Sequence, residues 1–204
     1  MFKLSEGKTR KRMIQTFALI SAAMLLGASF GACKKEKDKS PAPVPEEPEL
    51  ITTLDLELTR EGDTLTFRYR VENGFGTTSP GTVQVDTIVV DAGRVYDVSL
   101  KVLNHKVEPV EDITEEILEE SRDHLFLFLS EPATGPGSLI FSEGNKDPDG
   151  APVNQRGILT AGAAGRGTLR LYLMHDPIDK TGTTPGQSGG ETDLYAVFPV
   201  VIRE

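Results

Sequence analysis

The three histidines of this chain, His105, His124 and His175, each lie at the end of a segment in which apolar and polar residues alternate. Imidazole together with carboxylate is a common ligand set for Zn²⁺ and other divalent ions. His124, His175 and Asp193 are the candidate ligands of such a metal centre. The spacing alone does not identify a metal, because close pairs such as His-x₃-His are absent. The alternative is that each histidine ends a strand or pairs with a nearby carboxylate.

Oxygen ligands for a harder cation occur in the segment Asn145-Lys146-Asp147-Pro148-Asp149-Gly150. This segment approximates the first six positions of a calcium loop, with Asn145, Asp147 and Asp149 as ligands and a glycine at the sharp turn. The twelfth position is Arg156 in place of the bidentate glutamate, and the flanking segments have the alternation of strands. The sequence therefore supports two hypotheses, weak Ca²⁺ binding and a simple β-turn around the proline and glycine.

The composition excludes several other classes of function. The 204 residues carry 31 acidic and 22 basic side chains, a net charge of −9, so a surface for the phosphate backbone of nucleic acid is not expected. One cysteine cannot form an internal disulfide or a cysteine-based zinc site. Serine-nucleophile elbows and phosphate-binding loops do not occur. We therefore expect no nucleic-acid partner, no cofactor and no catalytic residues of these classes.

The N-terminal residues have the pattern of an export signal. Basic residues between positions 3 and 12 precede a mostly apolar run from Met13 to Ala32, which predicts a secretory signal peptide over residues 1–32. The run ends in Phe30-Gly31-Ala32-Cys33, which resembles the lipobox of bacterial lipoproteins, although that family prefers leucine where this chain has Phe30. The resemblance implies cleavage before Cys33 and acylation of Cys33. The alternative is an uncleaved membrane anchor helix.

Residues 33–49 are expected to form a lipidated linker. The segment from Lys34 to Glu49 contains four prolines and nine charged residues, a composition typical of an extended tether. By resemblance to lipoprotein sorting signals, Lys34 directly after Cys33 favours the outer membrane. The membrane is therefore an expected partner through the N-terminal lipid, with the following domain in the periplasm or at the cell surface.

Residues 50–204 have the periodicity of an all-β domain. Apolar residues alternate with polar ones from Thr53 to Thr59 and from Leu65 to Val71, which predicts a hairpin. Further strands are expected at about 82–90, 94–104, 124–130, 138–143, 152–161, 167–175 and 193–203, with one short helix within 112–122. We predict an antiparallel β-sandwich of about nine strands, with a small closed β-barrel as the alternative.

If successive strands run in opposite directions, their connections lie alternately at the two ends of the domain. The connections at one end are then short and those at the other end are long. The long connections comprise residues 72–81, the helical connection, residues 144–151 and residues 176–192, and all three histidines are expected at the same end. Long loops of compact domains are often functional. We therefore expect a binding or surface-assembly module that contacts a protein or glycan ligand through this end. The rival hypothesis is a metal-dependent hydrolase that uses the histidines and carboxylates there.

Two tripeptides, Asp63-Thr64-Leu65 and Asp86-Thr87-Ile88, resemble the O-glycosylation acceptor of exported Bacteroidota proteins. The resemblance implies that Thr64 and Thr87 are glycosylated.

A resemblance to a family covers most of the chain after the linker. Its landmarks are Leu50-Ile51-Thr52-Thr53, Glu111-Asp112-Ile113-Thr114-Glu115-Glu116, His124, His175-Asp176-Pro177 and Gly189-Gly190-Glu191-Thr192-Asp193. In order and spacing, these landmarks are similar to a group of small Bacteroidota lipoproteins of unknown function. Members of that group are sometimes assigned a type 1 periplasmic-binding fold, which requires repeated strand-helix-strand units. The strand-rich pattern of this chain favours the all-β domain instead.

Overall fold

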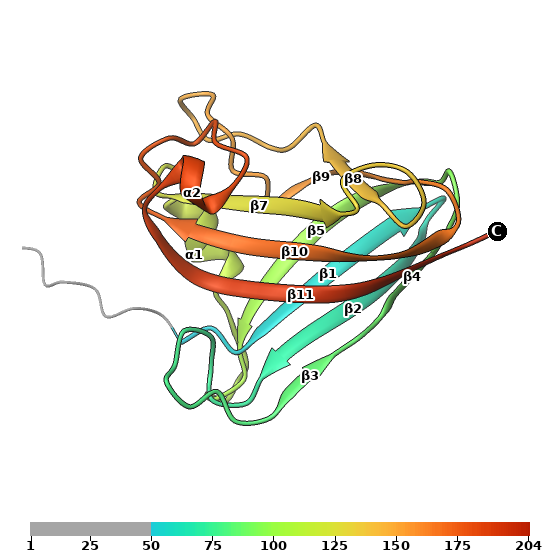
Figure 1. Ribbon diagram of the computed structural model, residues 1–204. Coiled ribbons are helices and arrows are strands. Elements are labelled where there is room, and N and C mark those ends of the chain that lie inside the picture. The colour runs from blue at the N-terminus through green and yellow to red at the C-terminus, as the bar shows by residue number, and fades with distance from the viewer. Residues whose placement is uncertain (1–49) are drawn as a thin grey trace, which may run out of the picture. The chain divides into compact units, whose positions relative to one another are not determined.

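The computed structural model describes residues 50–204, which form a sandwich of two β-sheets (Figure 1). The strands are β1 (Thr53–Arg60), β2 (Asp63–Val71), β3 (Val83–Val85), β4 (Ile88–Asp91), β5 (Val95–Asn104), β6 (Glu111–Asp112), β7 (His124–Glu131), β8 (Leu139–Ser142), β9 (Arg156–Ala161), β10 (Gly165–His175) and β11 (Glu191–Arg203). The helices are α1 (Thr114–Glu119) and α2 (Pro185–Ser188). Residues 1–49 lie outside the described residues. The predicted signal peptide, the predicted lipidation of Cys33 and the predicted linker all fall in that range.

The two sheets are open, which confirms the sandwich and makes the closed-barrel alternative wrong. The first sheet has the order β3-β2-β1-β5-β9-β8, with β6 paired to β5, and the second has the order β4-β11-β10-β7. Each sheet therefore ends in two edge strands. Among residues 50–204, no helix has the length and apolar character needed to cross a membrane.

The predicted hairpin at the start of the domain is confirmed as β1 and β2. Leu56 pairs with Phe67 in the ladder, so apolar side chains of both strands lie on the same face of the sheet. The loop between them is Glu61-Gly62, with φ of 54° and 93°. Two consecutive residues with positive φ are typical of the tight turns that join antiparallel strands.

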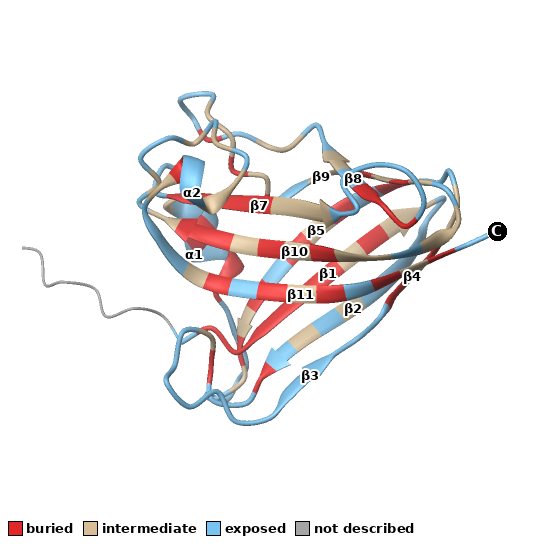
Figure 2. Ribbon diagram, viewed as in Figure 1, coloured by how far each residue is buried: buried red, intermediate tan, exposed pale blue. Residues whose placement is uncertain are grey.

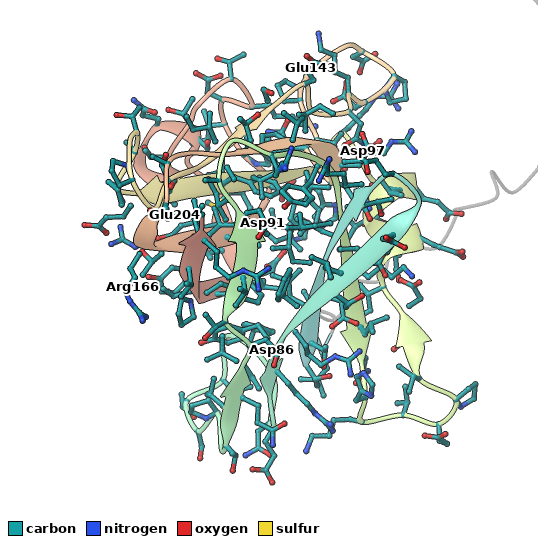
Figure 3. The ribbon with its side chains drawn as sticks, turned by 90° about the vertical axis from the view of Figure 1, so that its right-hand side faces the viewer. Asp86, Asp91, Asp97, Glu143, Arg166 and Glu204 are labelled. Carbon is teal, nitrogen blue, oxygen red and sulfur yellow. The ribbon has the colours of Figure 1, made fainter. Side chains whose placement is uncertain are left out.

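The predicted strand at 82–90 is wrong as a single element, because the chain there passes from one sheet to the other. β3 pairs with β2 in the first sheet, whereas β4 pairs with β11 in the second, and the β4–β11 pair is parallel. Asp86, labelled in Figure 3, lies at the crossing and accepts a hydrogen bond from the backbone N–H of Arg68 at 2.8 Å. Both halves are extended and rich in β-branched apolar residues, so together they have the composition of one continuous strand, which hides the crossing.

The main core lies between the two sheets and is visible as the buried stretches of the central strands (Figure 2). Leu54, Leu56, Leu58 and Leu100 contribute from the first sheet, and Phe126, Leu169, Leu171 and Phe198 from the second; all are fully buried. Leu125, Leu127 and Met174 form a smaller cluster on the opposite face of the second sheet. β7 and β10, which carry His124 and His175, therefore have apolar packing on both faces.

Candidate metal centre

Three of the four long connections meet at one end of the sandwich, as the alternation of strand directions predicts. The backbone N–H of Asp176, in the 176–190 loop, donates to the carbonyl of Asp123, in the helical connection, at 2.8 Å. Lys180, in the same loop, donates from Nζ to Asp147 Oδ2 in the 144–151 turn at 2.8 Å. In Figure 1, α1 and α2 lie at this end, beside the start of β7 and the end of β10.

His124, His175 and Asp193 come together here, from three neighbouring strands. His124 begins β7 and His175 ends β10, and the ladder pairs these two residues directly. Their rings are stacked, with centroids 4.8 Å apart and an interplanar angle of 21°. Asp193 in β11 places Oδ2 3.6 Å from Nδ1 of His175. One potential ligand atom from each residue lies within 4.8 Å of the other two.

A β-bulge in β11 brings Asp193 to this group. Leu173 pairs with Leu194 but the next residue, Met174, pairs with Thr192, so Asp193 is an extra residue without a partner in β10. Strict alternation would point Asp193 away from the face on which Leu194 is buried. A bulge changes the direction of a side chain in this way, and bulges are common beside functional sites.

A backbone carbonyl fixes the orientation of the His124 ring. The carbonyl oxygen of Glu120, which follows α1, lies 3.1 Å from His124 Nδ1. Because a carbonyl can only accept, Nδ1 is the donor, and in the neutral ring Nε2 is the nitrogen with the lone pair that a metal would bind. Metal-binding histidines generally donate their other N–H to a carbonyl or carboxylate in this manner.

Burial differs across the three candidate ligands and leaves one side open. His124 is 6% exposed, whereas the side chains of His175 and Asp193 are 44% and 27% exposed. Burial raises the pKa of Asp193 above its ordinary value, and the nearby His175 opposes that rise. A bound cation would favour the ionised carboxylate and so offset the effect of burial.

This donor set suits a transition-metal ion of the zinc type. Imidazole suits Zn²⁺, Fe²⁺ and Ni²⁺, whereas Ca²⁺ requires about six to eight oxygen ligands. Ligand atoms of a tetrahedral zinc ion lie about 3.3 Å apart, given bonds of about 2.0 Å. Because the candidate ligand atoms lie within 4.8 Å of one another, pairs of them would have to approach by up to about 1.5 Å on binding. Three protein ligands leave a coordination position for water or another molecule.

No protein-family model, curated protein or solved structure matches the chain. The candidate site is therefore defined by the geometry of its own residues.

The segment predicted as a calcium loop forms a β-turn, in which the backbone N–H of Gly150 donates to the carbonyl of Asp147 at 3.0 Å. Asp147 Oδ1 accepts from the backbone N–H groups of Asp149 and Ala151, and Asp147 Oδ2 accepts from Lys180. Asp149 is paired with Arg122, and Asn145 Oδ1 accepts from the backbone N–H of Arg156. Calcium binding here stays a prediction, and it requires Ca²⁺ to displace these protein donors.

The remaining predicted sites lie away from the metal centre. Thr64 and Thr87 are both exposed, Thr64 in β2 and Thr87 between β3 and β4, and their glycosylation stays a prediction. His105 is not a member of the group of potential metal ligands found among the described residues. Its backbone N–H donates to Thr52 Oγ1 at 2.8 Å.

Two features of the structure were not predicted from the sequence. A shallow pocket of about 530 Å³ is lined by residues from separate segments, among them Asp97 and Glu143, which Figure 3 labels, and Arg156. The second feature is the contact of Lys180 with Asp147 across two loops. One sequence signal for this contact is that Lys180 is the only lysine or arginine between Arg170 and Arg203.

Proposed function

We propose that the protein is a lipid-anchored binding module of the cell envelope whose long-loop end binds a divalent transition-metal ion of the zinc type. The observation that carries the metal proposal is the β-bulge that aligns Asp193 with His124 and His175. This proposal departs from the sequence-based expectation of a protein without a cofactor. A protein or glycan partner remains part of the proposal, because the three candidate ligands lie at the same end of the domain as the long loops.

Purified protein is expected to bind one zinc ion per chain, and His124→Ala or His175→Ala to abolish that binding. Each substitution removes one of the three donors, and the two that remain hold a metal ion poorly. Calorimetric titration with Zn²⁺, Co²⁺ and Ca²⁺ measures stoichiometry and preference, and we expect little binding of Ca²⁺. His105→Ala is the control and should bind zinc normally. Equal zinc binding by the His175→Ala and His105→Ala proteins would sink the proposal.

Cys33→Ser is expected to stop both cleavage and acylation, so that a precursor longer by residues 1–32 accumulates. One acyl chain gives only marginal membrane binding, so durable attachment requires the two or three chains that a lipoprotein cysteine carries. Intact-protein mass spectrometry detects the added acyl mass on the mature chain and its loss in the variant. A mature chain with a free Cys33 thiol would show that the anchor is wrong.

A metal-dependent hydrolase is the second candidate function. It is favoured by the three protein donors found among residues 50–204, because a fourth ligand position could then hold a water molecule whose pKa the metal would lower. This function would require zinc-dependent hydrolysis of an ester, amide or phosphoester by the wild-type protein. Hydrolysis that survives His124→Ala would come from another source.

A further inference from the structure

Lys180 joins three segments of the long-loop end. Its Nζ donates to Asp147 Oδ2 at 2.8 Å and to the backbone carbonyl of Ser121. Its side chain is 11% exposed and that of Asp147 is 3% exposed. The ammonium group holds the pKa of Asp147 below its ordinary value, with help from the backbone N–H groups of the turn. We call these contacts the Lys180 bridge.

The bridged segments continue directly into the candidate metal ligands. Ser121 precedes His124 by three residues, and Lys180 follows His175 by five. The residues next to the two histidines are also hydrogen-bonded, because the backbone N–H of Asp176 donates to the carbonyl of Asp123. The backbone stretches that orient the two imidazoles are therefore joined directly by this hydrogen bond and by the β7–β10 ladder, and Lys180 adds a second connection between the loops that lead to them.

The loop that carries Lys180 is ordered by its own hydrogen bonds. The backbone N–H of Asp179 donates to the carbonyl of Ser188 at 2.9 Å, and Thr183 donates from its hydroxyl to Gln187 Oε1 at 2.9 Å. The loop returns through Gly190 to β11, which carries Asp193. Because the loop holds its own shape, we expect it to move as a unit when its contact to the other segments is broken.

We infer that Lys180 is a positioning residue for the metal centre. It touches none of the three ligands, but it fixes the loop that joins His175 to Asp193 against the connection that leads to His124. Ligands that are held in place before binding lose less conformational freedom when the ion binds. Loss of the bridge should therefore weaken metal binding in a protein that remains folded. This inference rests on the proposed zinc function.

The test compares Lys180→Met with Arg122→Met in the full-length protein purified in detergent. Arg122 is the matched control, because it also joins the helical connection to the 144–151 turn, through Asp149, but both side chains are more than half exposed. We expect the Kd for Zn²⁺ to rise at least tenfold in Lys180→Met and to stay within twofold in Arg122→Met. The visible spectrum of the Co²⁺-loaded protein should also change in Lys180→Met only.

Circular dichroism and thermal unfolding establish that each variant is folded at the temperature of the titration. If Lys180→Met does not fold, Asp147→Asn takes its place, because it keeps an oxygen for the turn but removes the charge that faces Lys180. Wild-type zinc affinity in the folded variant would overturn the inference and leave the proposed function intact. Failure of the wild-type protein to bind zinc would instead overturn the proposed function.

Discussion

Phe198→Ala is expected to lower the free energy of unfolding by about 3–5 kcal/mol, as deletion of a fully buried phenylalanine does in other cores. Phe198 lies in β11, has no exposed surface and belongs to the main core between the two sheets. Its ring meets that of Tyr69, from the other sheet, with centroids 5.7 Å apart and an interplanar angle of 70°. The substitution removes apolar contacts that join the two sheets and leaves a cavity between them.

Chemical denaturation measures this effect, with Ile178→Ala as the control. Ile178 is a large apolar residue of the 176–190 loop but is 89% exposed, so its truncation should change stability by less than about 0.5 kcal/mol. Similar losses of stability in the two variants would contradict a core in which Phe198 connects the sheets.

The periodicity of apolar residues predicted most of the elements, because buried and exposed side chains alternate along a half-buried strand. The β1–β2 hairpin was predictable from the alternation of Leu54, Leu56 and Leu58 and from the turn at Glu61 and Gly62. Short helix α1 was predictable from the apolar spacing within 112–122. The alternation of apolar and polar residues does not show to which sheet a strand belongs. The crossing at Asp86 and the parallel β4–β11 pair were therefore not predictable.

The sequence predicted that the candidate ligands lie at neighbouring strand ends. It did not predict the direction in which their side chains point. His124 and His175 lie at neighbouring strand ends because the two strands run antiparallel and pair in register. Asp193 was predicted as a third ligand from its expected place near the two histidines, although a regular strand would turn its side chain away from their face. The bulge that corrects its direction depends on the pairing of two strands, which the sequence of one strand does not contain. Lys180 and Asp147 are 33 residues apart and meet only because the loops fold together.

Gly190→Ala is expected to destabilise the protein by about 2–5 kcal/mol and to weaken zinc binding as well. Gly190 has φ of 79°, where a residue with a side chain costs about 1–2 kcal/mol. A methyl group there would also lie against the backbone carbonyl oxygens of His175 and Asp176, closer than van der Waals contact allows. Overpacking of this kind typically costs about 1–3 kcal/mol.

Gly186→Ala is the matched control, because a methyl group at this position of α2 meets no atom within 4 Å and Gly186 does not have a positive φ. Its stability should be unchanged or higher by up to about 1 kcal/mol. Denaturation and zinc titration of the two variants measure stability and binding in parallel. Gly190 lies against the backbone of His175 and precedes Asp193 by three residues, so we expect relief of the overlap to displace one of these two ligands. A Gly190→Ala protein that lost stability but kept wild-type zinc affinity would show that the ion does not depend on this backbone contact.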